Sequence, residues 1–380
     1  MNDPPDLTGE LSRQLHDQVD HWYSSPLTVG EVRDRARVLR RRRRRTAVTT
    51  GVAATGVLVA VLPAGLAADG PAPRVTVEPP VYDGPVLGAP YVDGPRVVLP
   101  DGSVRDVARD YVGGAVLGDT LLGLRNDDTG FLVLDELDDA GQVVNTVVTE
   151  SGITFNADES AIAYVTDDEL IVRWEDGVAD LGEVNGGTPV RLVGGPDCTA
   201  GVATCAVYVD DELGGARAIT NTGASHAVEG EPHSLTDVAE DGRVSIVTGY
   251  TELPEPGSCS SVVSPGTTTE IHGSCDYTYG RFSPDGGLLS ASHPYLDGFG
   301  MGWLAILDAG TGAELARYES GSGGITSSVW EDDDHLLITS WEDHQWRVTR
   351  LGSDGATVVV LGPTPGSDAE PAYTVLGEGF

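Results

Sequence analysis

Basic residues are scarce in this sequence of 380 residues, and lysine is absent. All 23 basic residues are arginines, against 59 Asp and Glu, which gives a formal net charge of −36. Affinity for nucleic acid depends on Lys and Arg that neutralise phosphates, so this charge balance excludes a protein of that class. The 50 glycines and 23 prolines are about a fifth of the chain. That content excludes a long helical bundle and favours an all-β fold rich in turns.

Recognised catalytic motifs are also missing. The sequence contains no P-loop and no dinucleotide-binding fingerprint. It has no G-x-S-x-G motif either, because the nearest run, Ser320–Gly324, has its glycines at the wrong places for a nucleophile elbow. We therefore expect no catalytic residues, no cofactor-binding residues and no cofactor, and we predict that the protein is not an enzyme.

One long apolar run stands out in this acidic chain. Thr46–Ala68 carries no charge, and 23 helical residues reach about 34 Å, enough for a hydrocarbon core of about 30 Å. Six consecutive arginines precede the run: Arg40, Arg41, Arg42, Arg43, Arg44 and Arg45. Positive residues flanking a span stay in the cytoplasm. We therefore predict a single-pass signal anchor at 46–68, with residues 1–45 in the cytoplasm and the remainder outside the cell membrane.

Two other interpretations of this region remain open. Gly65 and Ala67 are small residues at the spacing of a signal-peptidase site, so the anchor could be cleaved, although the 45 residues before the run are long for a signal peptide. The arginine run could instead contact nucleic acid, but its position against the apolar run favours a role in membrane topology.

The predicted cytoplasmic stub, residues 1–45, has helical signals of its own. Thr28 and Glu31 form a capping box that leads into a short basic helix. Before it, an apolar stripe recurs at helical spacing, formed by Leu11, Leu15, Val19 and Trp22. An isolated helix of this length is marginal in water. We therefore expect the stub to lie on the membrane or to dock on a cytoplasmic partner.

The four cysteines fit an oxidising exterior. Cys259 and Cys275 lie almost opposite each other if the hairpin between them turns at Pro265 and Gly266. We predict local pairing, with disulfides Cys198–Cys205 and Cys259–Cys275. A Cys₄ zinc site is the alternative, although neither pair has the C-x₂₋₄-C spacing.

A unit of apolar strand, polar glycine turn and apolar strand repeats seven times after a proline-rich connector, residues 69–83. The copies are 96–107, 131–148, 170–182, 216–228, 261–272, 303–318 and 346–362. Their turn glycines are Gly102, Gly141, Gly177, Gly223, Gly266, Gly312 and Gly355, with spacings that average about 42 residues. That is the period of a four-stranded propeller blade.

A second hairpin with an acidic turn precedes four of these units, at 154–166, 237–248, 281–292 and 328–340. Together the two hairpins make a blade of strands a, b, c and d, innermost first. We predict a seven-bladed β-propeller of four-stranded antiparallel blades over residues 84–380. Strand a of the first blade is missing from 84–108, and the strand-like segment 371–380 is expected to supply it and close the ring.

The motif Phe282–Gly286, FSPDG, and its degenerate copies at 155–160, 238–242 and 329–334 resemble the TolB-like and WD-repeat β-propellers. The Gly-His and Trp-Asp signatures of WD repeats are absent, so the bacterial extracytoplasmic TolB-like type is the better match. The stub followed by a single span resembles uncharacterised actinobacterial membrane proteins. It also resembles anti-sigma factors loosely, but their His and Cys-x-x-Cys motif is lacking, since the stub has His16 and His21 and no cysteine.

Candidate ligand residues gather in the last repeat. Asp332, Asp333 and Asp334 are weak calcium candidates, because Ca²⁺ prefers oxygen ligands; without a D-x-D-x-D-G loop, solvated turn residues are the favoured interpretation. His335 and His344 do not match a zinc motif. The aromatic residues Trp330, Trp341 and Trp346 could form a ligand rim at the channel, although packing between blades is the more common use of such residues.

These observations leave three functional hypotheses. The first is a non-catalytic binding or scaffold module that recognises a protein, peptide or envelope glycan outside the cell. The second is a transmembrane regulator that couples an external propeller to a cytoplasmic partner, such as a sigma factor, through residues 1–45. The third is a hydrolase or lyase whose scattered carboxylates and histidines meet at the channel mouth.

Overall fold

The computed structural model describes residues 86–377 with gaps at 128, 185, 196–204, 212–214, 229–233, 252–256, 268, 295–300, 322 and 369. They belong to one compact unit, Thr76–Phe380. The stub at 1–45, the arginines Arg40–Arg45, the span at 46–68 and the connector at 69–83 lie outside the described residues. Among the described residues, no helix has the length and apolar character needed to cross a membrane.

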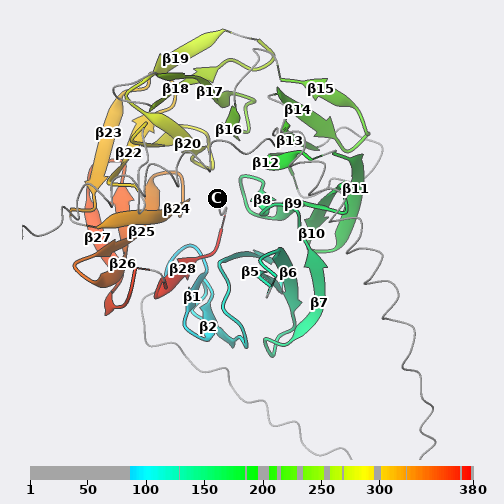
Figure 1. Ribbon diagram of the computed structural model, residues 1–380, viewed down its shortest axis with the longest axis vertical. Helices are drawn as coiled ribbons and strands as arrows, with labels where there is room; N and C mark the ends of the chain where they lie inside the picture. Colours follow the sequence, from blue (N-terminus) through cyan, green and yellow to red (C-terminus); the bar gives the residue numbers. More distant parts are fainter. Residues whose placement is uncertain are drawn as a thin grey trace, which may run out of the picture. The chain divides into compact units, whose positions relative to one another are not determined.

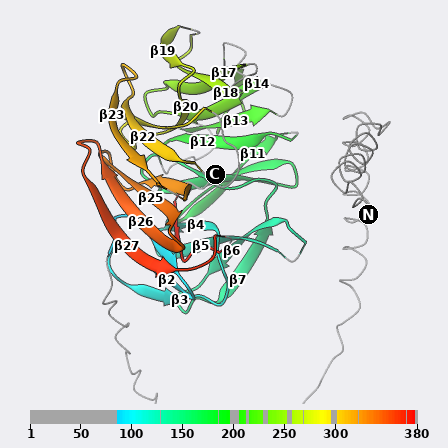
Figure 2. The same ribbon diagram turned by 60° about the vertical axis from the view of Figure 1, so that its left-hand side comes forward.

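The described residues form 28 strands in seven four-stranded antiparallel sheets, which confirms the predicted all-β, seven-bladed propeller. Figures 1 and 2 show the sheets arranged in a ring, each sheet a blade. We number the blades in chain order. Blade one consists of β28 (Tyr373–Val375), β1 (Tyr91–Asp93), β2 (Arg96–Val98) and β3 (Val104–Asp106).

The other blades each use four consecutive strands. Blade two has β4 (Gly113–Leu117), β5 (Thr120–Asn126), β6 (Leu132–Leu137) and β7 (Val143–Val148). Blade three has β8 (Thr154–Phe155), β9 (Ala161–Thr166), β10 (Glu169–Trp174) and β11 (Gly177–Glu183). Blade four has β12 (Thr188–Gly194), β13 (Cys205–Asp211), β14 (Gly215–Thr220) and β15 (Ser225–Ala227).

Blades five to seven continue the pattern around the ring. Blade five has β16 (Ser234–Val238), β17 (Val244–Thr251), β18 (Gly257–Val263) and β19 (Glu270–Ser274). Blade six has β20 (Thr278–Phe282), β21 (Leu288–Ser292), β22 (Trp303–Asp308) and β23 (Glu314–Glu319). Blade seven has β24 (Gly324–Trp330), β25 (His335–Glu342), β26 (Gln345–Gly352) and β27 (Thr357–Pro365).

The ring closes through the C-terminal strand, as the sequence predicted. β28 pairs with β1 in the register Tyr91↔Val375, Val92↔Thr374 and Asp93↔Tyr373. A second connection comes from Glu331 of blade seven, whose carboxylate accepts the backbone N–H of Gly88 at 2.7 Å and is also bound by the guanidinium of Arg350. Residues 243 positions apart are thus joined beside the closing strand.

The hydrophobic core lies between neighbouring blades. One cluster joins Ala163 and Val172 of blade three to Leu192 and Val207 of blade four, all with no exposed surface. Burying each such aliphatic side chain is worth about 1.5–3 kcal/mol. The outermost strands alternate instead, and Val178 on β11 is 60% exposed. Because each blade covers the face of the next, the inner strands are apolar along most of their length, whereas the outer strands show a period of two.

The turn glycines follow the predicted positions with one exception. Six of them adopt positive φ, where a side chain would be strained: Gly102, Gly141, Gly223, Gly266, Gly312 and Gly355. Gly177 does not share this conformation, because it follows the two central turn residues, Glu175 and Asp176, and closes the turn opposite Trp174. It opens β11 directly opposite Trp174, and a Cβ there would lie 2.3 Å from the indole. Close packing against Trp174 therefore requires this glycine.

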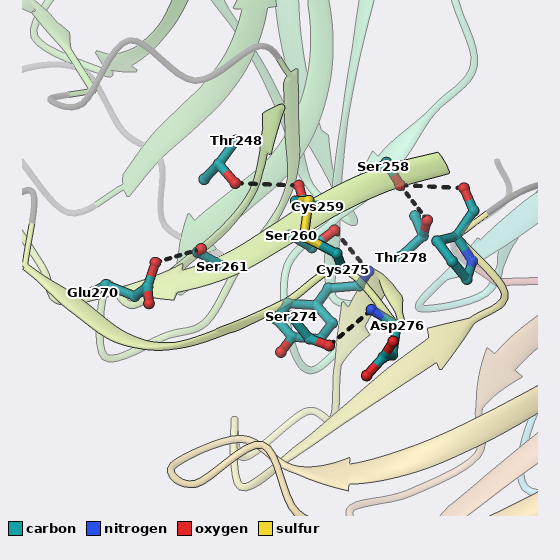
Figure 3. The surroundings of a disulfide bond; sticks show 12 residues. Thr248, Ser258, Cys259, Ser260, Ser261, Glu270, Ser274, Cys275, Asp276 and Thr278 are labelled. Atoms are coloured by element: carbon teal, nitrogen blue, oxygen red, sulfur yellow. Dashed lines mark hydrogen bonds between the residues drawn. A yellow bond between two sulfur atoms is a disulfide. The ribbon is translucent and has the colours of Figure 1, made fainter. Parts of the chain in front are cut away.

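The disulfide Cys259–Cys275 is confirmed, with a Cα–Cα distance of 4.0 Å (Figure 3). It excludes the alternative of a Cys₄ zinc site. Cys205 is also disulfide-bonded, while Cys198, its predicted partner, lies outside the described residues. Beside the first bridge, the hydroxyls of Ser258 and Thr278 lie 2.5 Å apart, which connects blade five to the start of blade six.

Candidate functional site

Three adjoining cavities lie inside the ring of described residues. We name them after one wall residue each. The Thr188 cavity has a volume of about 290 Å³, the Gly114 cavity about 180 Å³ and the Trp330 cavity about 30 Å³. The first two share Gly152 and Ile153, and the last two share Ser328 and Val329. Shared walls make them parts of one central channel.

Every blade contributes to the channel wall, because each places its innermost strand or the residue next to it there. The wall residues include Gly114, Ile153, Val190, Leu235, Arg281, Ser328 and Val375. One water needs about 10–15 Å³, so the Thr188 cavity alone has room for a small organic group or a side chain.

A charged cluster from three consecutive blades borders the channel. Asp237 of blade five has no exposed side-chain surface, and its Oδ1 lies 3.9 Å from Nε of Arg191 in blade four and 3.6 Å from Nη1 of Arg281 in blade six. Its Oδ2 accepts the backbone N–H of Phe282 at 2.7 Å. Side-chain exposure is 5% for Arg191 and 25% for Arg281. We call these three residues the arginine–aspartate cluster.

Contacts across the blades fix the position of Arg281. Its Nη1 donates to the carbonyl oxygen of Val190 at 2.9 Å, and the same carbonyl accepts the hydroxyl of Thr154 at 2.7 Å. The indole N–H of Trp330 donates to the carbonyl oxygen of Arg281 at 3.1 Å. Side chain and backbone of Arg281 are therefore held from blades four and seven.

Backbone bulges in the inner strands place the arginine–aspartate cluster. The pairing register shifts between Pro189 and Arg191 in β12, between Leu235 and Asp237 in β16, and across Arg281 in β20, where the register moves between Tyr279 and Phe282. A bulge interrupts the strict alternation of a strand and re-aims the next side chain. The three charged residues owe their common location to this repeated irregularity.

The two guanidinium groups of this cluster are not proton-transfer groups. Arginine stays protonated in proteins, so neither guanidinium can act as a general base. A buried carboxylate close to two guanidinium groups is stabilised in its charged form. The carboxylate of Asp237 lies between the two guanidinium groups, so the cluster connects blades four, five and six at the channel wall.

The three calcium candidates lie in the turn after β24, and each accepts hydrogen bonds from different partners. Asp332 Oδ1 accepts the backbone N–H groups of Asp334 and His335, each at 2.8 Å. Asp333 accepts the N–H of Asp285 in blade six at 2.9 Å, and Asp334 accepts the hydroxyl of Ser353 at 3.2 Å. Among the described residues, no group of three or more His, Cys, Asp or Glu is placed to hold a metal ion.

The predicted aromatic rim does not form as one surface. Trp346 has no exposed surface and its indole N–H donates to the carbonyl oxygen of Ser367 at 2.7 Å, so it is a packing residue. Trp341 is the direct partner of Trp346 across β25 and β26 and lies opposite Gly324, at the other end of β24 from Trp330. Only Trp330 of the three lines a channel cavity described above. The sequence cannot show which tryptophan lines the channel, because the position of a side chain along a blade depends on the pairing register of its strand.

The arginine–aspartate cluster was missed by sequence reasoning, although a signal exists. In blades five and six, an apolar residue comes directly before the acidic turn of the inner hairpin. Asp237 and Arg281 each precede that apolar residue, and Thr154 has the same position in blade three. Polar residues at equivalent positions of neighbouring repeats face one another in a ring. Aligning the repeats by their turns could have identified these positions.

No known family matches the sequence, and no curated protein matches it. Similar solved structures include a putative TolB from Agrobacterium tumefaciens, at 14% identity over 58% of this chain and 83% of that one, with a TM-score of 0.38. The propeller domain of the Trilobed protease from Pyrococcus furiosus shares 9% identity over 66% and 84%, with a TM-score of 0.46. The WD40 propeller domain of Doa1 shares 12% over 74% and 88%, with a TM-score of 0.42.

Proposed function

We propose that this chain is a membrane-anchored, non-catalytic binding module whose propeller takes a protein, peptide or envelope glycan at its central channel. The observation that carries this proposal is the channel itself, which receives wall residues from every blade and is bordered by the arginine–aspartate cluster. A concave site with a few polar groups among apolar side chains is the usual form of a binding site.

Photo-crosslinking from inside the channel tests the proposal. A benzophenone amino acid at Thr188, an exposed residue of the Thr188 cavity, should capture a partner in intact cells. The same group at Ser225, an exposed residue on the outermost strand of the same blade, is the matched control. We expect a crosslinked species at Thr188 that is absent at Ser225. Equal products at both positions, or none at Thr188, would contradict a ligand site in the channel.

We further propose that the propeller faces the outside of the cell membrane. This proposal is supported by the uncharged run Thr46–Ala68 behind six arginines and by the disulfide Cys259–Cys275, a bond typical of oxidising compartments. Protease added to spheroplasts should degrade the propeller while an epitope placed in residues 1–45 stays protected. A propeller that resists protease until the membrane is permeabilised would overturn this topology.

A further inference from the structure

We propose that the Gly114 cavity binds one uncharged, apolar side chain of a protein or peptide, of the size of leucine or phenylalanine. This inference rests on the proposed function and specifies which of its ligand classes the channel takes. The cavity has a volume of about 180 Å³, and its wall residues belong to blades seven, one, two and three.

The wall of this cavity is apolar, and none of the described residues that form it carries a charge. Leu124 and Ile153 come from the core cluster between blades two and three. Val329 and Val375 come from the cluster between blades seven and one. The other two cavities differ, because both have charged wall residues, including Arg281. A charged group buried without a partner is costly, so this wall favours an uncharged occupant.

Gly113 leaves part of this space empty, although the backbone does not require a glycine there. It pairs with Leu124 across β4 and β5, and a Cβ at Gly113 would meet nothing closer than Leu124 at 3.7 Å. Its φ lies outside the left-handed region, so an ordinary side chain would fit. Gly114 differs, because a Cβ there would lie 2.3 Å from the carbonyl oxygen of Leu122. Glycine weakens a strand, and one that the fold does not require marks a place where a ligand can approach closely.

The volume of the cavity matches one apolar side chain. An engineered protein cavity of about 150 Å³, lined by leucine, isoleucine and phenylalanine, takes up benzene. Val112, whose side chain is 54% exposed, extends the apolar surface of this wall. Moving an apolar side chain from water into such a space is favourable roughly in proportion to the area buried.

A glycan fits this wall less well than a protein or peptide does. A sugar ring carries several hydroxyl groups, and each one that is buried without a hydrogen bond costs free energy. The side chains of the wall offer three hydroxyl groups, on Ser327, Ser328 and Thr374, and otherwise only hydrocarbon. A leucine or phenylalanine side chain needs no such partner.

Titration of the full-length protein in lipid nanodiscs with N-acetyl-leucinamide tests the inference. The reporter is the ¹³C-labelled methyl groups of Ile153, which is 4% exposed and lies in the wall. We expect saturable shifts with N-acetyl-leucinamide and N-acetyl-phenylalaninamide, and none with N-acetyl-serinamide or N-acetylglucosamine. Gly113→Val, which fills the space, should weaken binding of N-acetyl-leucinamide by about tenfold or more, because the probe can no longer bury its side chain.

Gly249→Val is the matched control. Gly249 lies in β17 of blade five, a Cβ there would meet nothing within 4 Å, and the residue lines none of the three cavities. This variant should leave binding unchanged. Val112→Ser removes an exposed apolar side chain from the wall and should weaken binding severalfold, while its melting curve stays that of the parent protein.

Two results of the titration would overturn the inference. One is a Gly113→Val variant that binds N-acetyl-leucinamide as the parent protein does, and the other is N-acetylglucosamine binding as tightly as the leucine derivative. Crosslinking from Thr188 that persists in either case would leave the proposed function standing. If the inference holds, the species crosslinked from Thr188 contains peptides of a second protein, and Gly113→Val reduces its yield while Gly249→Val does not. A crosslinked species that carries saccharides instead would overturn the inference alone.

Discussion

Deleting residues 370–380 is expected to abolish the single cooperative unfolding transition of the propeller. This deletion removes β28, whose three residues pair with β1, and the hydrogen bond from the N–H of Leu376 to the carbonyl oxygen of Pro90. It also removes the buried side chains of Val375 and Leu376, which pack in two different clusters on either side of blade one. Both interfaces of that blade would lose contacts.

The expected loss is a large part of the total stability. Two buried aliphatic side chains are worth about 1.5–3 kcal/mol each, and each backbone hydrogen bond adds about 0.5–1.5 kcal/mol. Whole domains are stable by only about 5–15 kcal/mol. Differential scanning calorimetry should show a broad, early transition. A chain ending at Gly377 keeps β28 and is the control. A 370–380 deletion that melts within a degree or two of this control would show that closure does not depend on the strand.

Replacing Asp135 with alanine is expected to destabilise blade two severely. This carboxylate has no exposed surface and accepts hydrogen bonds from Arg125 at 2.6 and 3.2 Å and from the hydroxyl of Thr146 at 2.6 Å. The hydroxyl of Tyr111 lies 3.4 Å away. Burial and this carboxylate raise the pKa of Tyr111 to about 12, so the phenol stays neutral. Asp135→Ala would leave Arg125, 14% exposed, without its counter-charge.

Breaking a buried ion pair by removing one partner costs about 3–5 kcal/mol of unfolding free energy. Urea unfolding followed by circular dichroism should therefore show a midpoint far below that of the parent protein. Asp241→Ala is the control, because Asp241 pairs with Arg243 but is 56% exposed, and exposed pairs contribute about 0–1 kcal/mol. A similar loss in both variants would mean that burial of the Asp135 pair is not what makes it stabilising.

The same carboxylate predicts a pH dependence. Burial alone would raise the pKa of Asp135, but the hydrogen bonds from Arg125 and Thr146 outweigh it and leave the pKa below its ordinary value of 3.8. A lowered pKa in the folded state contributes stability above pH 3.8 that disappears as the pH falls through the folded value. Between pH 5 and pH 2, roughly, Asp135→Asn should lose less unfolding free energy than the parent protein.

The hairpins could be predicted from the sequence because their determinants are local. A turn glycine, an acidic turn residue and alternating apolar residues act within about a dozen positions of one another. This is why all seven outer hairpins and the partners of the disulfide Cys259–Cys275 follow from the printed residues. The β4–β5 hairpin went unnoticed although Gly118 and Asp119 form a two-residue turn between apolar strands, a signal of the same local kind.

The composition of the channel depends on contacts that no local pattern encodes. Arg191, Asp237 and Arg281 come from three blades, and bulges in their strands decide where the side chains point. Trp330 and Trp346 belong to one blade and were both candidates for the ligand rim, yet one lines the channel and the other is fully buried. The sequence by itself determined the repeat, its strands and its closure, because those follow from turn chemistry and periodicity. Only the tertiary structure decided which side chains meet, because register, bulges and the packing of one blade on the next set their direction.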